Sequence, residues 1–109
     1  MIEIENKRGD TISWECSYVD DAGSKVDITN YVISCEARNE SDTNELLFSV
    51  SSSSGTIDVY DAINGLFRII IDTSSFSIGS YVVDIQYVYN GLVKSSDTFR
   101  LKIIEDVTK

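Results

Sequence analysis

Apolar and polar residues alternate with a period of two along most of the chain. In residues 11–18 the apolar positions are Ile12, Trp14, Cys16 and Tyr18. In residues 31–38 they are Tyr31, Ile33, Cys35 and Ala37. Because successive side chains of a β-strand point to opposite faces, this spacing predicts two half-buried strands whose inner faces help to form a core.

Six further segments carry a strand pattern, at residues 2–5, 46–50, 56–60, 66–71, 81–89 and 99–103. The dense β-branched run at 66–71 is typical of a strand that lies centrally or is covered on both faces. In 81–89 the spacing places five residues on one side: Tyr81, Val83, Ile85, Tyr87 and Tyr89. No longer window has convincing helical spacing, so the pattern predicts an all-β chain.

Turn-forming residues separate these runs. Asp20-Asp21-Ala22-Gly23, Asn64-Gly65 and Asn90-Gly91 supply residues that tolerate positive φ, and the last two lie between apolar runs, as in hairpins. The serines at 51–54 with Gly55 predict a flexible hydrophilic loop rather than a domain boundary. The length, 109 residues, is common for one domain. About seven to eight strands at this spacing predict one domain over residues 1–109, an antiparallel immunoglobulin-like β-sandwich.

The sequence contains no proline. Proline is one of the residues that block exposed sheet edges, so charge is left as the main protection against edge pairing. The absence also leaves open an edge strand that pairs with a partner.

The charge is strongly acidic. Eighteen acidic residues against nine basic ones give a net charge of −9, which argues against direct binding to nucleic acid because that depends on neutralising phosphates. Two interpretations stay open: a surface that favours solubility, or an acidic face that meets a basic partner or mimics DNA. No apolar run is long enough to cross a bilayer and no signal peptide is visible, so we expect a chain that is neither secreted nor membrane-bound.

Residues that carry chemistry are scarce. The chain has no histidine, which removes the commonest general base, the commonest metal ligand and every triad that uses imidazole. Two cysteines without histidine cannot make a zinc site of the usual kind. The six glycines are scattered singly, so they form no phosphate-binding loop. We therefore expect no enzyme, no cofactor, and no catalytic, cofactor-binding or metal-binding residues.

Acidic residues gather in two loops, at Asp20, Asp21 and Asp27 and at Asp58 and Asp61. Carboxylates of this kind bind calcium in some proteins. Their spacing fits no EF-hand loop, and acids are common in exposed turns, so the sequence favours turn residues over a calcium site.

Two short features have alternative interpretations. Cys16 and Cys35 fall in the apolar phase, which favours inward-pointing reduced thiols, while a bridge between them needs close strands in an oxidising place. Arg8-Gly9-Asp10 spells the tripeptide that integrins recognise, but Gly and Asp also suit a tight turn between two strands, and we favour the turn.

Several short motifs, taken in their order along the chain, resemble those of known protein domains. Lys7-Arg8-Gly9-Asp10-Thr11, Asp20-Asp21-Ala22-Gly23 and Asp27-Ile28-Thr29-Asn30-Tyr31 resemble the start of phage baseplate upper-protein N-terminal domains. The later half is similar to small immunoglobulin-like phage virion proteins, through Asn64-Gly65-Leu66-Phe67, Ile78-Gly79-Ser80-Tyr81, Asp84-Ile85-Gln86-Tyr87 and residues 103–108. The resemblance covers nearly the whole chain and indicates a phage structural domain rather than one position in the particle.

The resemblance implies a virion protein of the tail, baseplate, neck or head surface, assembled in the host cytoplasm. Its implied partners are other phage structural proteins, with a homo-oligomer such as a trimer or ring, and neither nucleic acid nor membrane. In the family the domain commonly precedes a fibre or receptor-binding part; this sequence stops at Lys109, so we expect a module that decorates, plugs or adapts.

Two alternatives remain. One is an acidic phage-encoded inhibitor of a host nucleic-acid-processing protein, which acids clustered on one face would support. The other is a cell-surface carbohydrate-binding module, for which Tyr60, Tyr87 and Tyr89 are the candidate aromatic residues.

Overall fold

The computed structural model describes residues 1–105 of the chain. These residues form nine β-strands and the loops that connect them. The strands are β1 (Glu3–Lys7), β2 (Ile12–Ser17), β3 (Val32–Asn39), β4 (Leu46–Ser51), β5 (Ile57–Asp61), β6 (Leu66–Ile71), β7 (Gly79–Tyr89), β8 (Leu92–Ser95) and β9 (Phe99–Ile104). The all-β prediction is confirmed. Residues 106–108 of the C-terminal motif lie outside the described residues.

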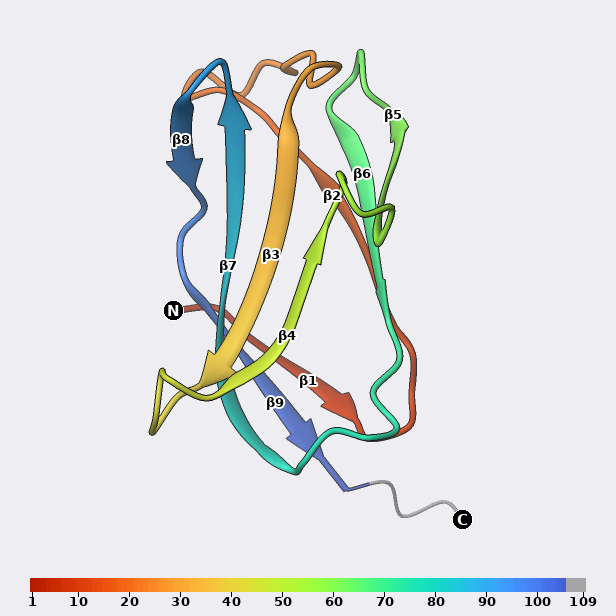
Figure 1. Ribbon diagram of the computed structural model, residues 1–109, viewed down its shortest axis with the longest axis vertical. Helices are drawn as coiled ribbons and strands as arrows, with labels where there is room; N and C mark the ends of the chain where they lie inside the picture. The colour runs from red at the N-terminus through yellow and green to blue at the C-terminus, as the bar shows by residue number, and fades with distance from the viewer. Residues whose placement is uncertain (106–109) are drawn as a thin grey trace.

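The strands form two sheets that face each other as a sandwich (Figure 1). The larger sheet has the order β1-β9-β7-β3-β4, with β8 added to β7, and the smaller sheet has the order β2-β6-β5. The central position predicted for 66–71 is therefore confirmed, since β6 lies between two partners.

Two details of the predicted sandwich are wrong. The strand pairs are not all antiparallel, because β1 pairs with β9 in parallel, from Glu3 opposite Arg100 to Lys7 opposite Ile104. The count is nine rather than seven to eight. The strand that the pattern did not show is β8, whose residues are all exposed and therefore carry no alternation.

The core lies between the sheets and contains most of the predicted inward residues. Ile33, Cys35 and Ala37 are completely buried, as is Val83 of β7. The predicted core residues Trp14, Cys16 and Tyr18 only pack against the core from partly buried positions. They are less covered because β2 is an outer strand of its sheet. Tyr89, which the spacing places on the same side of β7 as Val83 and Ile85, lies at the end of the strand and is 43% exposed.

The predicted hairpin turns are present. Asn90 and Gly91 have φ values of 52° and 80° and connect β7 to β8 as a two-residue turn of the type that favours Asn-Gly. Gly65 also needs to be glycine, because a Cβ there would lie 2.7 Å from the Val26 carbonyl oxygen and 2.8 Å from that of Tyr18. This close approach fixes the 18–26 loop beside the β5–β6 turn.

The Arg8-Gly9-Asp10 segment forms the tight turn that the sequence predicted, between β1 and β2. The Asp10 amide donates to the Lys7 carbonyl at 3.0 Å. Thr73, which is completely buried, accepts a hydrogen bond from the Gly9 amide and donates one to the Asp10 carbonyl, both at 2.8 Å. The turn is thus bound to the segment that follows β6.

Candidate functional site

β2 is an outer strand with one unpaired side. Its only partner among the described strands is β6, in a register that places Trp14 opposite Ile69 and Glu15 opposite Arg68. The Tyr18 amide donates to the Gly65 carbonyl at 2.9 Å, so residues 12, 14 and 16 also direct their main-chain groups toward β6. Ser13, Glu15 and Ser17 therefore turn their N–H and C=O groups away from the sheet.

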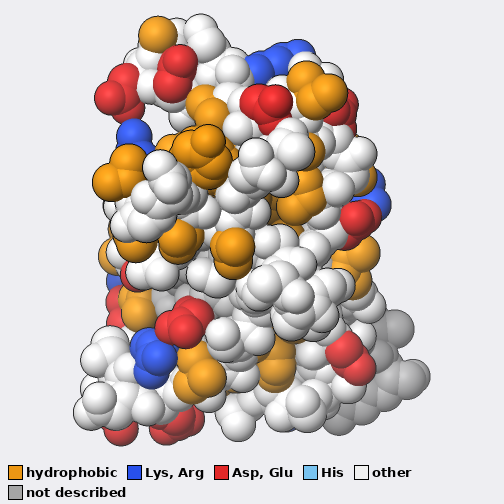
Figure 2. Space-filling view, turned by 45° about the horizontal axis from the view of Figure 1, so that its top comes forward, with side chains coloured by type: hydrophobic (Ala, Val, Ile, Leu, Met, Phe, Trp, Pro, Cys, Tyr) orange, Lys and Arg blue, Asp and Glu red, His pale blue; other side chains and the backbone are white. Residues whose placement is uncertain are grey.

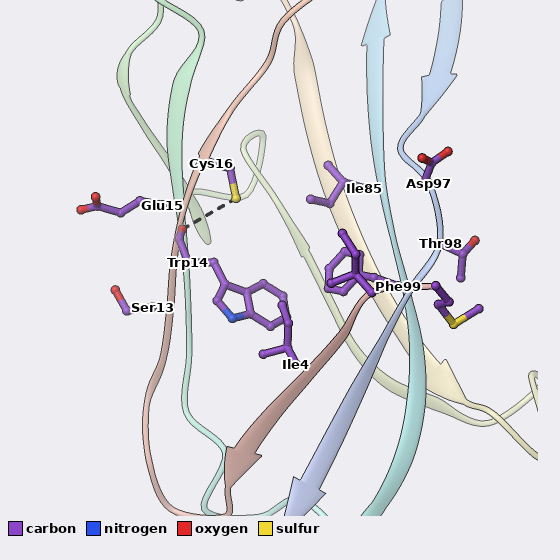
Figure 3. A pocket seen from close by; sticks show the side chains of 11 residues that line it. Ile4, Ser13, Trp14, Glu15, Cys16, Ile85, Asp97, Thr98 and Phe99 are labelled. Atoms are coloured by element: carbon purple, nitrogen blue, oxygen red, sulfur yellow. Dashed lines mark hydrogen bonds between the residues drawn. The ribbon is translucent and has the colours of Figure 1, made fainter.

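A groove of about 610 Å³ runs along this side of β2, between the two sheets (Figure 3). Its lining comes from the chain start, β2, β7 and the segment that enters β9: Met1, Ile2, Ile4, Ser13, Trp14, Glu15, Cys16, Ile85, Asp97, Thr98 and Phe99. Most of the surface that these residues present is hydrocarbon. An unpaired strand edge and an apolar groove thus lie side by side.

Trp14 and Phe99 are the largest side chains of the groove. Their rings meet edge to face, with centroids 5.5 Å apart, and the Ile4 side chain lies next to the indole (Figure 3). Neither ring is fully buried, and Met1 and Ile2 at the groove are each 73% exposed. Leu92 and Ile63 are as exposed elsewhere on the molecule, so what distinguishes this site is that its apolar side chains line one groove.

The two thiols are free, as the sequence favoured, but their surroundings differ. Cys35 is buried in the core, and burial raises the pKa of its thiol to about 12. Cys16 is partly exposed in the groove, and burial raises its pKa too, with the sulfur 3.9 Å from the Trp14 carbonyl oxygen. The prediction that both point fully inward is therefore correct for Cys35 and only partly for Cys16.

The outer face of the small sheet carries a row of alternating charges that runs across its three strands. Arg68 of β6 lies opposite both Asp58 of β5 and Glu15 of β2. Its guanidinium is 3.0 Å from a Glu15 carboxylate oxygen and 3.9 Å from one of Asp58, and it covers the Tyr60 ring at 4.8 Å from the centroid. The row ends at Glu15, whose side chain is 66% exposed beside the free edge.

Other acidic side chains are dispersed over the molecule. They occur on strands of both sheets and in loops at both ends, and Figure 2 shows them as separate red groups on the face in view. Several are paired with cations; the Arg100 guanidinium, for example, contacts Glu40 at 2.6 Å and Glu3 at 3.4 Å. On the face in view, the acidic side chains of the described residues are spread apart, which does not favour the inhibitor hypothesis.

Asp20 and Asp27 stabilise turns, as the sequence favoured, whereas Asp58 and Asp61 belong to strand β5 and not to a loop. One carboxylate oxygen of Asp20 accepts hydrogen bonds from the amides of Ala22 and Ser24, both at 2.9 Å. Asp27 accepts the Thr29 amide in the same way, and this bond and that of the Thr29 hydroxyl lower the pKa of Asp27. Within residues 1–105, no group of three or more acidic or cysteine side chains is arranged to hold a metal ion.

The three tyrosines suggested for carbohydrate binding do not form one surface. Tyr87 is buried, with its ring stacked on Tyr18 at 4.1 Å between centroids, so its assignment as an exposed aromatic is wrong. It faces inward because it shares a side of β7 with Val83 and Ile85. Tyr89 is exposed but stacks on Tyr31 at 4.8 Å, and one face of Tyr60 is covered by Arg68.

The sequence left open an edge strand that pairs with a partner, but it did not identify β2. Trp14 was assigned to the core, and the groove residues Met1, Ile2 and Phe99 were not singled out as a site. The period-two pattern identifies the inner face of each strand, but it contains no signal for which strand lies at an edge.

Among the described residues, no helix has the length and apolar character needed to cross a membrane. No protein-family model and no curated protein sequence matches this chain.

Proposed function

We propose that this chain is a non-enzymatic attachment module of a bacteriophage particle that binds other structural proteins of the tail, baseplate, neck or head surface. The observation that carries the proposal is the unpaired edge of β2 beside the apolar groove. Free main-chain groups at a sheet edge are a template for an added strand, and natural proteins normally block such edges unless they use them.

The strand order supports an immunoglobulin-like assignment within the sandwich. A sheet of β2, β6 and β5 faces one in which β9, β7, β3 and β4 are neighbours, as in variable-type domains where extra strands join the larger sheet. Near the start of β7, the Tyr81 hydroxyl donates to the Ser77 carbonyl at 2.7 Å. Immunoglobulin domains use a tyrosine in this way at the corresponding corner.

The placement in a phage particle is supported by the resemblance of the ordered motifs to phage baseplate and virion domains. Several of these motifs fall at a turn or a strand start: Ile78-Gly79-Ser80-Tyr81, for example, opens β7, while Asp84-Ile85-Gln86-Tyr87 lies in the middle of the same strand. The proposal includes assembly in the host cytoplasm and several copies in the particle, as a trimer or ring, because virion sites are symmetric.

Mass spectrometry of purified particles tests this proposal. We expect the chain in gradient-purified particles, at a constant ratio to the major structural proteins, after a high-salt wash that removes adsorbed proteins. An antibody or gold label should then locate it at one part of the particle in electron micrographs. Its presence in infected-cell lysate but not in washed particles would contradict the proposal.

A further inference from the structure

We propose that the free edge of β2 pairs with an extended segment of a partner protein that places a Lys or Arg side chain opposite Glu15 and apolar side chains in the groove. This inference rests on the proposed function as an attachment module. It adds the partner's chemistry: an added strand with a cation between two apolar residues.

The main chain of β2 provides the hydrogen bonds. Ser13, Glu15 and Ser17 each direct one N–H and one C=O away from β6. An added strand of about six residues, roughly 20 Å long, would bond all of them and become the fourth strand of the small sheet.

The charge of the partner follows from the row that ends at Glu15. Across β5, β6 and β2 the row reads Asp58, Arg68, Glu15, so its charges alternate and it carries one excess negative charge. A cation on the added strand would lie directly opposite Glu15 and extend the alternation. Asp97, which also lines the groove, is acidic as well, and no Lys or Arg lines it.

The apolar part follows from strand geometry. Glu15 points to the outer face, while Trp14 and Cys16 point into the groove. Partner residues on either side of the cation would therefore face inward and contact Trp14 and Phe99. These two rings line the groove of about 610 Å³ between the sheets.

A second copy of this chain is a poorer occupant. Antiparallel pairing of two β2 edges, centred so that the free groups of residues 13, 15 and 17 meet, places Glu15 opposite Glu15 of the other copy. Like charges directly opposite each other are destabilising, and each copy carries a net charge of −9.

A pair of synthetic peptides tests the inference. The probe is the capped peptide Ser-Thr-Val-Lys-Leu-Thr-Ser, and its control replaces the central Lys with Glu. Amide NMR spectra of the ¹⁵N-labelled chain should shift at β2 and the groove on titration with the Lys peptide to about 1 mM. The Lys peptide should bind about five- to tenfold more tightly than the Glu peptide. No shift with the Lys peptide, or equal binding of both peptides, would overturn the inference.

Two proline variants separate edge pairing from adsorption to the groove. Ser13→Pro removes an outward N–H of β2 that plays no part in the β2–β6 ladder, so the fold should survive. Ser95→Pro is the matched control at the outer side of β8, since the Ser96 amide bonds Ile85 and Ser95 therefore faces away from β7. We expect Ser13→Pro to weaken the Lys peptide at least about tenfold and Ser95→Pro to leave it unchanged. Equal effects would overturn edge pairing.

A charge reversal at Glu15 gives a result that a purely structural role of this residue would not give. Glu15→Lys should reverse the preference, so that the Glu peptide binds more tightly than the Lys peptide. A variant that weakens both peptides equally would contradict the pairing opposite Glu15. Concentration-dependent dimers of the wild-type chain that Ser13→Pro dissociates would assign the edge to a second copy and overturn the inference.

The outcomes also separate this inference from the proposed function. A chain present in washed particles that fails to bind the Lys peptide leaves the virion proposal standing and removes the docking mode. A chain that binds the peptides with the expected preferences but is absent from particles leaves the docking mode standing and removes the virion proposal.

Discussion

The two flanks of the sandwich, where the edges of the sheets meet, are closed in different ways. At one flank the chain itself crosses from β4 to β5 through residues 52–56. Ser52 extends the β3–β4 pairing, since its amide donates to the Ile33 carbonyl at 2.8 Å and its hydroxyl accepts the Ile33 amide at 2.9 Å. The Thr56 hydroxyl accepts the Ser51 amide at 2.8 Å, so this hydrophilic segment satisfies its own main chain.

Among the described residues, the chain itself joins the other flank at one end, and an ion pair between Lys94 of β8 and Asp21 of the loop after β2, at 3.7 Å, bridges the far end. The chain crosses from β1 to β2 at the turn held by Thr73, and above that turn β2 and the entry to β9 are separated by the groove (Figures 1 and 3). Polar side chains supply main-chain partners at the closed flank. At the open flank, apolar side chains and unpaired main-chain groups remain, where we propose that another molecule binds.

The largest expected contrast is in thiol reactivity. Alkylation of the native chain with iodoacetamide near neutral pH should modify Cys16, in the open flank, at least about 100-fold faster than Cys35, because only a thiolate reacts and Cys35 is both buried and shifted to a pKa of about 12. Peptide mapping by mass spectrometry measures the two rates. In denaturant the rates should become equal, and equal rates in the native chain would show that the flank opens onto the core.

The stability of the turn that joins β1 to β2, at one end of the open flank, should depend on Thr73. Thr73→Val keeps the shape but removes both bonds to the 9–10 turn, which should lower the free energy of unfolding by about 2 kcal/mol. Urea unfolding followed by tryptophan fluorescence measures the change. Thr11→Val, at an exposed position, is the control, and a similar loss in both variants would assign the effect to the hydroxyl in general.

The closed flank should be less sensitive to a single change. Ser52→Ala leaves the Ile33 amide without its side-chain acceptor, at a cost of about 1 kcal/mol. Ser13→Ala, the matched change on the open flank, should stay within about 0.5 kcal/mol because Ser13 is exposed and its hydroxyl makes no hydrogen bond among the described residues. Equal losses in urea unfolding would mean that the flanks are closed alike.

The smallest effect concerns the large sheet near the open flank, where Arg100 of β9 lies opposite Glu3 of β1. Arg100 of β9 binds Glu40 and Glu3, and its hydrogen bonds lower the pKa of Glu40 below the ordinary 4.5. A lowered folded-state pKa adds stability that is present above pH 4.5 and is lost as the pH falls through the lowered value. Glu40→Gln should therefore flatten the stability curve below pH 4.5, and Glu45→Gln should not. Parallel curves for wild type and Glu40→Gln would contradict this.

The sequence by itself determined the class of structure and most of the core. The inward positions of β3 and of β7 up to Tyr87 could be identified because the side-chain period of a strand is a local property. The turns at Asn64-Gly65 and Asn90-Gly91 were predictable for the same reason, since positive φ selects for particular residues.

Only the tertiary structure decided which strands are neighbours and which edge stays free. The parallel pairing of β1 with β9 joins residues about a hundred positions apart, and it leaves β2 with β6 alone. Alternation records the face that a side chain occupies, whereas hydrogen bonds between strands lie in the plane of the sheet and involve main-chain groups that every residue has. For that reason Trp14 was predicted in the core, while the fold places it in a groove beside an unpaired edge.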